Sequence, residues 1–69
     1  MELMKVERDK VDVRASLQDL LIINNALNEV CNGLDVPEFE TRMGVPSDQV
    51  QSLLATVQRI LDELERSGA

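Results

Sequence analysis

Few residues in this chain of 69 have side chains that could do chemistry. Glu38 and Glu40 form one pair of carboxylates, and Asp62, Glu63 and Glu65 form an acidic group near the C-terminal end. Paired carboxylates can supply a general acid and base, and clustered carboxylates can bind a cation. However, a chain this short has little interior in which to enclose a catalytic pocket, and the acidic group lacks the spacing of a calcium loop. We therefore expect no acid–base catalysis by Glu38 and Glu40, and we expect the C-terminal acidic group to be a solvated face without a metal site.

Cys31 is the only cysteine and the one candidate thiol nucleophile. The chain has no His and no Tyr, and no Lys lies near Cys31 in the sequence. A thiol without a neighbouring base or cation stays protonated and unreactive, so we expect an inert, buried cysteine. The sequence also lacks a glycine-rich phosphate-binding loop. These observations predict a protein that is not an enzyme and that has no catalytic residue and no cofactor.

The formal net charge of −6 is distributed unevenly. Residues 1–14 contain four basic and four acidic residues, whereas the remainder contains three arginines and nine acids. An acidic body repels nucleic acid and anionic membranes, and it attracts a basic protein partner. No stretch approaches the roughly 20 apolar residues of a membrane span, and the N-terminal residues lack the apolar core of a signal peptide. Because a single cysteine also cannot form an intramolecular disulfide, we expect a cytoplasmic protein with no membrane association.

The positions of these residues depend on the elements that carry them, and residues 3–14 have two interpretations. A hairpin that turns at Arg8-Asp9 would form the pairs Glu7–Lys10, Val6–Val11, Lys5–Asp12 and Met4–Val13. These pairs would place opposite charges on one face and apolar side chains on the other, which stabilises an antiparallel ribbon. The alternative is an extension of the first helix, but this would place Lys10 in an apolar seam, and the run Val11–Val13 forms helices poorly. The hairpin is favoured, although Arg-Asp is not the Asn-Gly of a tight turn.

Three helices are expected after this segment, giving a mainly α fold with a helical-hairpin core in a single domain of residues 1–69. The first helix covers about 16–33, with Ser16 and Asp19 as an acidic capping box and Gly33 as a left-handed C′ residue. A short helix at 36–43 has Pro37 in its first turn and an apolar face formed by Phe39 and Met43. We expect the first and third helices to pack antiparallel, bridged by that face.

The third helix, at 47–66 with Ser47 as its N-cap, has a heptad-like apolar stripe. Domains of this size bury only about 60% of their unfolded surface, so the stripe should complete its burial on a second copy. We therefore predict a homodimer that uses this stripe, the N-terminal ribbon or both. The residues expected to support self-association are Val50, Leu53, Leu54, Val57, Ile60, Leu61 and Leu64.

A row of asparagines on the first helix is the best candidate for a partner-binding surface. Asparagine is a mediocre helix former, so four of them in nine positions need a reason. Their amides could bind a partner's backbone or fix the register of paired helices, and the alternative is that they are a solvated edge. With the acids nearby, the candidate partner-binding residues are Asn24, Asn25, Asn28, Asn32, Glu29, Asp35, Glu38 and Glu40.

Residues 37–57 resemble a helix-turn-helix in outline, with Gly44 at the turn. In that resemblance Gln49, Gln51 and Ser52 would face the major groove, where amides can read adenine. Two features oppose it. Glu40 occupies a position that usually needs a small residue, and the second helix opens with Asp48, which repels phosphates.

Taken together, the sequence predicts a small acidic protein-interaction module, of the inhibitor, antitoxin, immunity or adaptor type and of bacterial character. A transcriptional regulator that uses residues 37–57 is the alternative, and an accessory subunit of a larger assembly is a third.

Overall fold

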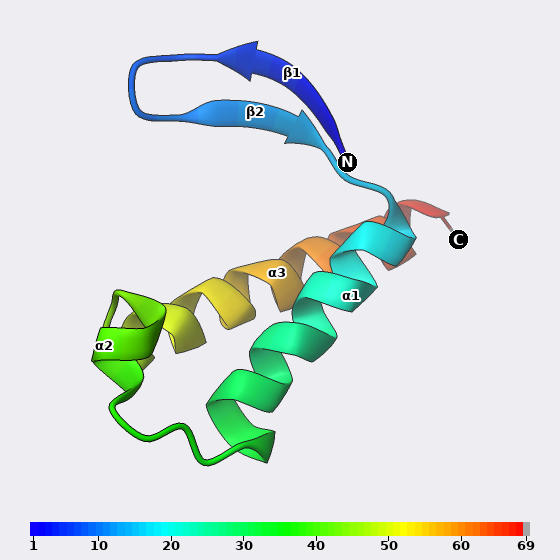
Figure 1. Cartoon of the computed structure of the whole chain (residues 1–69). Helices are drawn as coiled ribbons and strands as arrows, with labels where there is room; N and C mark the ends of the chain where they lie inside the picture. The colour runs from blue at the N-terminus through cyan, green and yellow to red at the C-terminus, as the bar shows by residue number, and fades with distance from the viewer. Residues whose placement is uncertain (69) are drawn as a thin grey trace.

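The computed structural model describes residues 1–68, which form a mainly helical domain with an N-terminal hairpin (Figure 1). Strands β1 (Glu2–Val6) and β2 (Val11–Arg14) are antiparallel. Helix α1 (Leu17–Asn28) continues into a π-helical turn, η1 (Glu29–Gly33), and is followed by α2 (Phe39–Met43) and α3 (Ser47–Gly68). The predicted fold class is confirmed, and the helical interpretation of residues 3–14 is wrong.

The register of the hairpin differs from the expected one at a single point. Val6 pairs with Val11 and Lys5 pairs with Asp12 as predicted, and the Glu7 N–H donates to the Lys10 carbonyl at 2.8 Å to close the turn. The predicted pairing of Met4 with Val13 is wrong, because Leu3 lies opposite Val13 and the ladder is irregular between Leu3 and Lys5. Met4 is thus the extra residue of a β-bulge.

Helix α1 begins at the capping box that the sequence indicates. The Asp19 N–H donates to Ser16 Oγ at 3.1 Å, and the Ser16 N–H donates to Asp19 Oδ2 at 3.1 Å. These two bonds satisfy donors that the first turn of a helix leaves free. Since Arg14 ends β2 and Leu17 begins α1, only Ala15 and Ser16 connect the hairpin to the helices.

The C-terminal end of α1 does not have the predicted left-handed glycine. Among the residues described, the left-handed backbone positions are Glu38 and Gly44, so the role assigned to Gly33 is wrong. The helix widens instead into η1, where the Leu34 N–H donates to the Glu29 carbonyl at 2.7 Å, and Leu34 then adopts an extended backbone. This hydrogen bond, from residue i+5 to residue i, satisfies a carbonyl at the end of the helix without a positive φ at Gly33.

Helix α2 is shorter than expected, and its start is displaced. Glu38 precedes it with φ 52° and ψ 48°, so Pro37 lies in the preceding turn rather than in the first helical turn. Phe39 is half-buried, but Met43 is exposed, and α2 packs along neither α1 nor α3, so the expected bridge between these two helices is wrong. Gly44 ends the helix with φ 80°, as its predicted turn position requires.

The core lies between α1 and α3, which run in opposite directions and splay apart toward α2 (Figure 1). Helix α3 starts at Ser47, which is therefore its first residue and not its N-cap. Its buried side chains recur every three to four residues and are Val50, Leu54, Val57 and Leu61. They face the half-buried side chains of α1 and η1, namely Leu20, Ile23, Leu27 and Val30. No described side chain falls below 2% exposure, so this core is thin.

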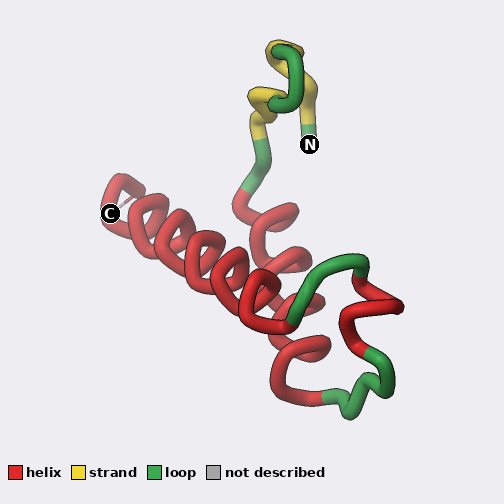
Figure 2. Tube along the Cα trace, turned by 90° about the vertical axis from the view of Figure 1, so that its left-hand side faces the viewer, coloured by secondary structure: helices red, strands yellow, loops and turns green. Residues whose placement is uncertain are grey.

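The hairpin stands apart from this core. The strands contact each other and α1 contacts α3, but neither strand packs along a helix. Figure 2 shows the hairpin projecting beyond the start of α1. The radius of gyration is 13.7 Å, compared with about 11 Å for a compact chain of this length. The molecule is therefore more extended than a closed domain of its size.

Candidate partner-binding surfaces

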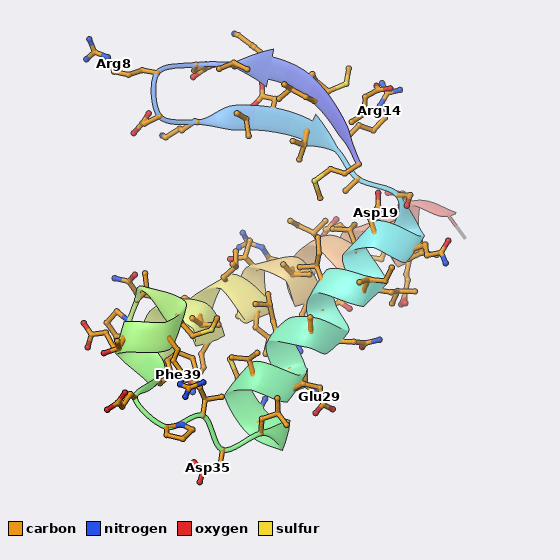
Figure 3. All side chains as sticks on the ribbon, viewed as in Figure 1. Arg8, Arg14, Asp19, Glu29, Asp35 and Phe39 are labelled. Atoms are coloured by element: carbon orange, nitrogen blue, oxygen red, sulfur yellow. The ribbon has the colours of Figure 1, made fainter. Side chains whose placement is uncertain are left out.

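The predicted amide and acidic residues extend from the second half of α1 through η1 and the following loop into α2. Glu29 and Asp35 lie at this end of the molecule (Figure 3). We call the exposed members of the group the amide–acid surface, which comprises Asn25, Asn28, Glu29, Asn32, Asp35, Glu38 and Glu40. Asn24 lies behind this surface, because its side chain is half-buried.

Two asparagines of the row are tied to each other. Asn32 Nδ2 donates to Asn28 Oδ1 at 2.9 Å, across the junction of α1 and η1. Asn24 Oδ1 is different, since it is buried and has no hydrogen-bond partner within residues 1–68. A buried acceptor without a donor costs about 1–3 kcal/mol, which a stable helix would avoid by using an apolar residue there. Asn24 therefore needs an explanation other than the stability of α1.

The π-helical turn sets the shape of this surface. Such turns are rare and are often found at functional sites, because they redirect the side chains that follow. Gly33 closes the turn against Glu29: a methyl group at Gly33 would lie 2.5 Å from Glu29 Oε2. The Glu29 carboxylate thus occupies the space that the Cβ atom of any larger residue would need in place of Gly33. Sequence reasoning did not anticipate this contact, since a π-helical turn has no established sequence signature.

The acids of the surface have no counter-ions within the described chain. The ion pairs of residues 1–68 involve Asp19, Glu7 and Glu63, and none involves Glu29, Asp35, Glu38 or Glu40. No lysine or arginine occurs between Ala15 and Thr41. Four unpaired carboxylates produce a negative potential that would favour a basic partner.

The predicted self-association residues divide into two groups. Val50, Leu54, Val57 and Leu61 are buried against α1 within the same chain. The other three are exposed along one flank of α3, and we call them the α3 flank: Leu53, Ile60 and Leu64. A contact with another molecule that leaves this fold intact can use only the second group. Near the C-terminal end, Leu64 borders an open hollow of about 470 Å³ that Leu17 also lines.

The hairpin contributes a second exposed apolar surface. The bulge at Met4 allows Leu3 and Val6, three residues apart, to pair with Val13 and Val11 on the same face. We call these four residues the hairpin face, and all of them are exposed, with Val6 at 66%. The opposite face has two oppositely charged pairs, Glu2–Arg14 and Lys5–Asp12.

The base of the hairpin is held by Asp19. The amino group of Met1 lies 2.8 Å from Asp19 Oδ2, and this contact, aided by the Ser16 N–H, lowers the pKa of Asp19. The carboxylate therefore links β1, the connection and the first turn of α1. It is half-buried and salt-bridged, which suits a structural role.

The described residues contain no group of three or more His, Cys, Asp or Glu side chains arranged to bind a metal. Cys31 is free and half-buried in η1. In the segment that resembles a helix-turn-helix, Gln49, Gln51 and Ser52 are exposed, but so are Asp48 and Glu40. The acids would repel a phosphate backbone at the surface that would have to approach it.

No helix within residues 1–68 has both the length and the apolar character needed to cross a membrane. No family model matches the chain, and searches of curated proteins and of solved structures found no match either.

Proposed function

We propose that this chain is a small, acidic, non-enzymatic protein-interaction module that works as a homodimer, of the inhibitor, antitoxin, immunity or adaptor type. The observation that carries the proposal is the amount and kind of surface left uncovered. The accessible surface is 5639 Å², whereas a compact monomer of this mass exposes about 4,300 Å². The difference includes the hairpin face and the α3 flank, which are apolar.

An apolar surface of this extent has a cost for a chain that works alone. Contiguous exposed apolar patches promote association, and soluble monomers usually keep them small. A thin core adds to the problem, because a domain of this size has little stability to spare. Coverage by another polypeptide removes both difficulties, which supports an interaction role over a solitary one.

The amide–acid surface supports a second contact, with a basic partner. Its carboxylates lack counter-ions within residues 1–68, and the exposed amides of Asn25, Asn28 and Asn32 can donate and accept hydrogen bonds. Asn24 keeps a buried oxygen without a donor, a cost that is easier to understand if the row serves binding. We further propose a cytoplasmic location, which suits the free thiol of Cys31.

A pair of photo-crosslinking variants tests this proposal in the cells from which the chain comes. One carries a photoreactive side chain in place of Asn28, on the amide–acid surface. The control carries it in place of Glu63, which is also exposed but lies on the last part of α3. We expect the first variant to trap a basic protein that the second does not trap.

The dimer is tested separately, by the mass of the purified chain from light scattering over a range of concentrations. A mass of two chains that falls on dilution supports the proposal. The same crosslinked products from both variants, together with a single-chain mass at every concentration, would remove it.

A further inference from the structure

Among the exposed apolar residues, which also include Leu17, Leu21 and Ile22 on α1, two surfaces on different elements do not cover each other. The hairpin face lies on β1 and β2, and the α3 flank lies on the longest helix. Neither strand packs along a helix of its own chain. Each surface therefore lacks the apolar partner that the other could provide.

The connection explains why the hairpin is not closed over its own helices. Only Ala15 and Ser16 separate β2 from α1, and Ser16 is fixed by both bonds of the capping box. The Met1 amino group is held on Asp19 in the same first turn. To fold down onto α3 of the same chain, the hairpin would have to rotate at Ala15 and break the contact between Met1 and Asp19.

The two surfaces are comparable in length. The hairpin face runs along β1 from Leu3 to Val6, which is about 10 Å. The α3 flank extends from Leu53 to Leu64, which is about 16 Å along a helix. A hairpin face laid along the α3 flank would thus cover about two thirds of the flank.

The excess of exposed surface in one chain is similar to the area that a subunit buries when it forms a dimer. The excess over a compact monomer is roughly 1,300 Å² per chain. Each partner in a stable dimer buries about 800 Å² in a standard interface, and more where the dimer is obligate. One symmetric interface per chain therefore accounts for the excess, and no larger assembly is needed.

The charges favour contact through the hairpin. The whole net charge of −6 resides in the residues after Arg14, so two helical bodies placed face to face would repel each other. Residues 1–14 are neutral, and the hairpin face has no charged side chain. A hairpin can therefore approach the acidic body of a second copy without net repulsion.

We propose that the hairpin face of one copy packs on the α3 flank of a second copy, and that the reciprocal contact completes a two-fold symmetric dimer. In this dimer, the hairpin of each chain packs on its partner, and the α3 flank of each chain is covered by the partner's hairpin. This arrangement specifies the contact behind the homodimer of the proposed function and rests on that proposal. It also leaves the amide–acid surface, at the opposite end of α1, free in both chains.

Directed disulfides test the arrangement, in a background where Cys31 is replaced by Ser. One protein carries Val11→Cys, on the hairpin face, and the other carries Ile60→Cys, on the α3 flank. Mixing the two under mild oxidation should produce a crosslinked pair that contains one chain of each kind. As a control, Lys5→Cys on the charged face of the hairpin should crosslink to Ile60→Cys only weakly.

The outcomes distinguish the alternatives. Crosslinks between two Ile60→Cys chains would indicate contact between the helices and overturn the arrangement, while the homodimer itself would stand. An intramolecular crosslink in the double variant, with the mass of one chain, would show that the hairpin closes on its own helix, which also overturns it. A wild-type mass of one chain at every concentration would remove the homodimer and the arrangement together.

Solution affinity provides a second readout. Val11→Thr keeps the shape of the side chain and replaces one methyl group by a hydroxyl, which the hairpin tolerates because Val11 is exposed in the single chain. We expect dimer dissociation to become about a hundredfold easier, since the substitution occurs twice in a symmetric dimer. Lys5→Thr should change it little, and equal effects of the two substitutions would contradict the arrangement.

Discussion

Leu3 lies directly opposite Val13 in the hairpin, three residues before Val6, which lies opposite Val11. In a regular strand, residues three apart point to opposite faces, so the bulge at Met4 is what places both on the hairpin face. Deletion of Met4 should therefore preserve every pair of the ladder and only remove the irregularity. Cross-strand nuclear Overhauser effects between Leu3 and Val13 should persist in that variant.

Deletion of Lys5 is the matched control, because it also shortens β1 by one residue. It would place Met4 opposite Asp12 and remove the Lys5–Asp12 pair. We expect a weaker hairpin in that variant, seen as smaller dispersion of the β1 and β2 amide signals. Loss of the Leu3–Val13 contact on deletion of Met4 would show that the bulge is not the source of the register.

Asn24 provides a test of the trade-off between stability and binding. Replacement by Leu removes a buried oxygen without a partner and adds apolar volume beside the core, so the free energy of unfolding should rise by about 1–2 kcal/mol. Asn25→Leu, at an exposed position, should change it by less than about 0.5 kcal/mol. Urea unfolding with both variants measures the difference. If Asn24→Leu destabilises the chain, its amide has a donor that the present geometry does not include.

Two glycines should differ in how much stability they lose when replaced by alanine. Gly44 has φ 80° and open space around it, so Gly44→Ala should cost about 1 kcal/mol through backbone strain alone. Gly33 has no positive φ, and its new methyl group would meet only the end of the flexible Glu29 side chain. Gly33→Ala should therefore be nearly neutral in thermal unfolding and should displace the Glu29 carboxylate. A larger loss for Gly33→Ala would mean that the π-helical turn depends on that contact.

Local interactions explain why much of this fold follows from the sequence. The capping box needs only Ser16 and Asp19 three residues apart, and the apolar stripe of α3 needs only helical periodicity. The features that the sequence did not predict depend on packing between elements or on rare backbone conformations. The bulge at Met4 is one, and the left-handed Glu38 is another, because a Glu seldom adopts φ 52°. Which α3 residues face α1 and which stay exposed also required the placement of α1.

Because the α3 stripe divides into buried and exposed residues, two nearby positions should respond differently to the same substitution. Val57 is 6% exposed and faces α1, so Val57→Asp would bury a carboxylate and should unfold the chain. Ile60 is 44% exposed, so Ile60→Asp should leave the helices intact while it disrupts association. Far-UV circular dichroism and light scattering on both variants measure the two effects. A folded Val57→Asp variant would count against the assigned core, and an unfolded Ile60→Asp variant would count against the exposed flank.

The position of Asp19 predicts how the hairpin base responds to acid. Its pKa is lowered in the folded chain, chiefly by the Met1 amino group and then by the Ser16 N–H. A group with a lowered folded pKa stabilises the fold above its unfolded pKa of about 4, and that contribution is lost as the pH falls through the folded pKa. Acid should therefore loosen the first turn of α1 and the base of β1 before it affects α3. Nuclear magnetic resonance titration of the Asp19 carboxyl measures this directly, and acetylation of the Met1 amino group should move its pKa upward. An unchanged Asp19 pKa after acetylation would show that the amino group does not hold the base of the hairpin.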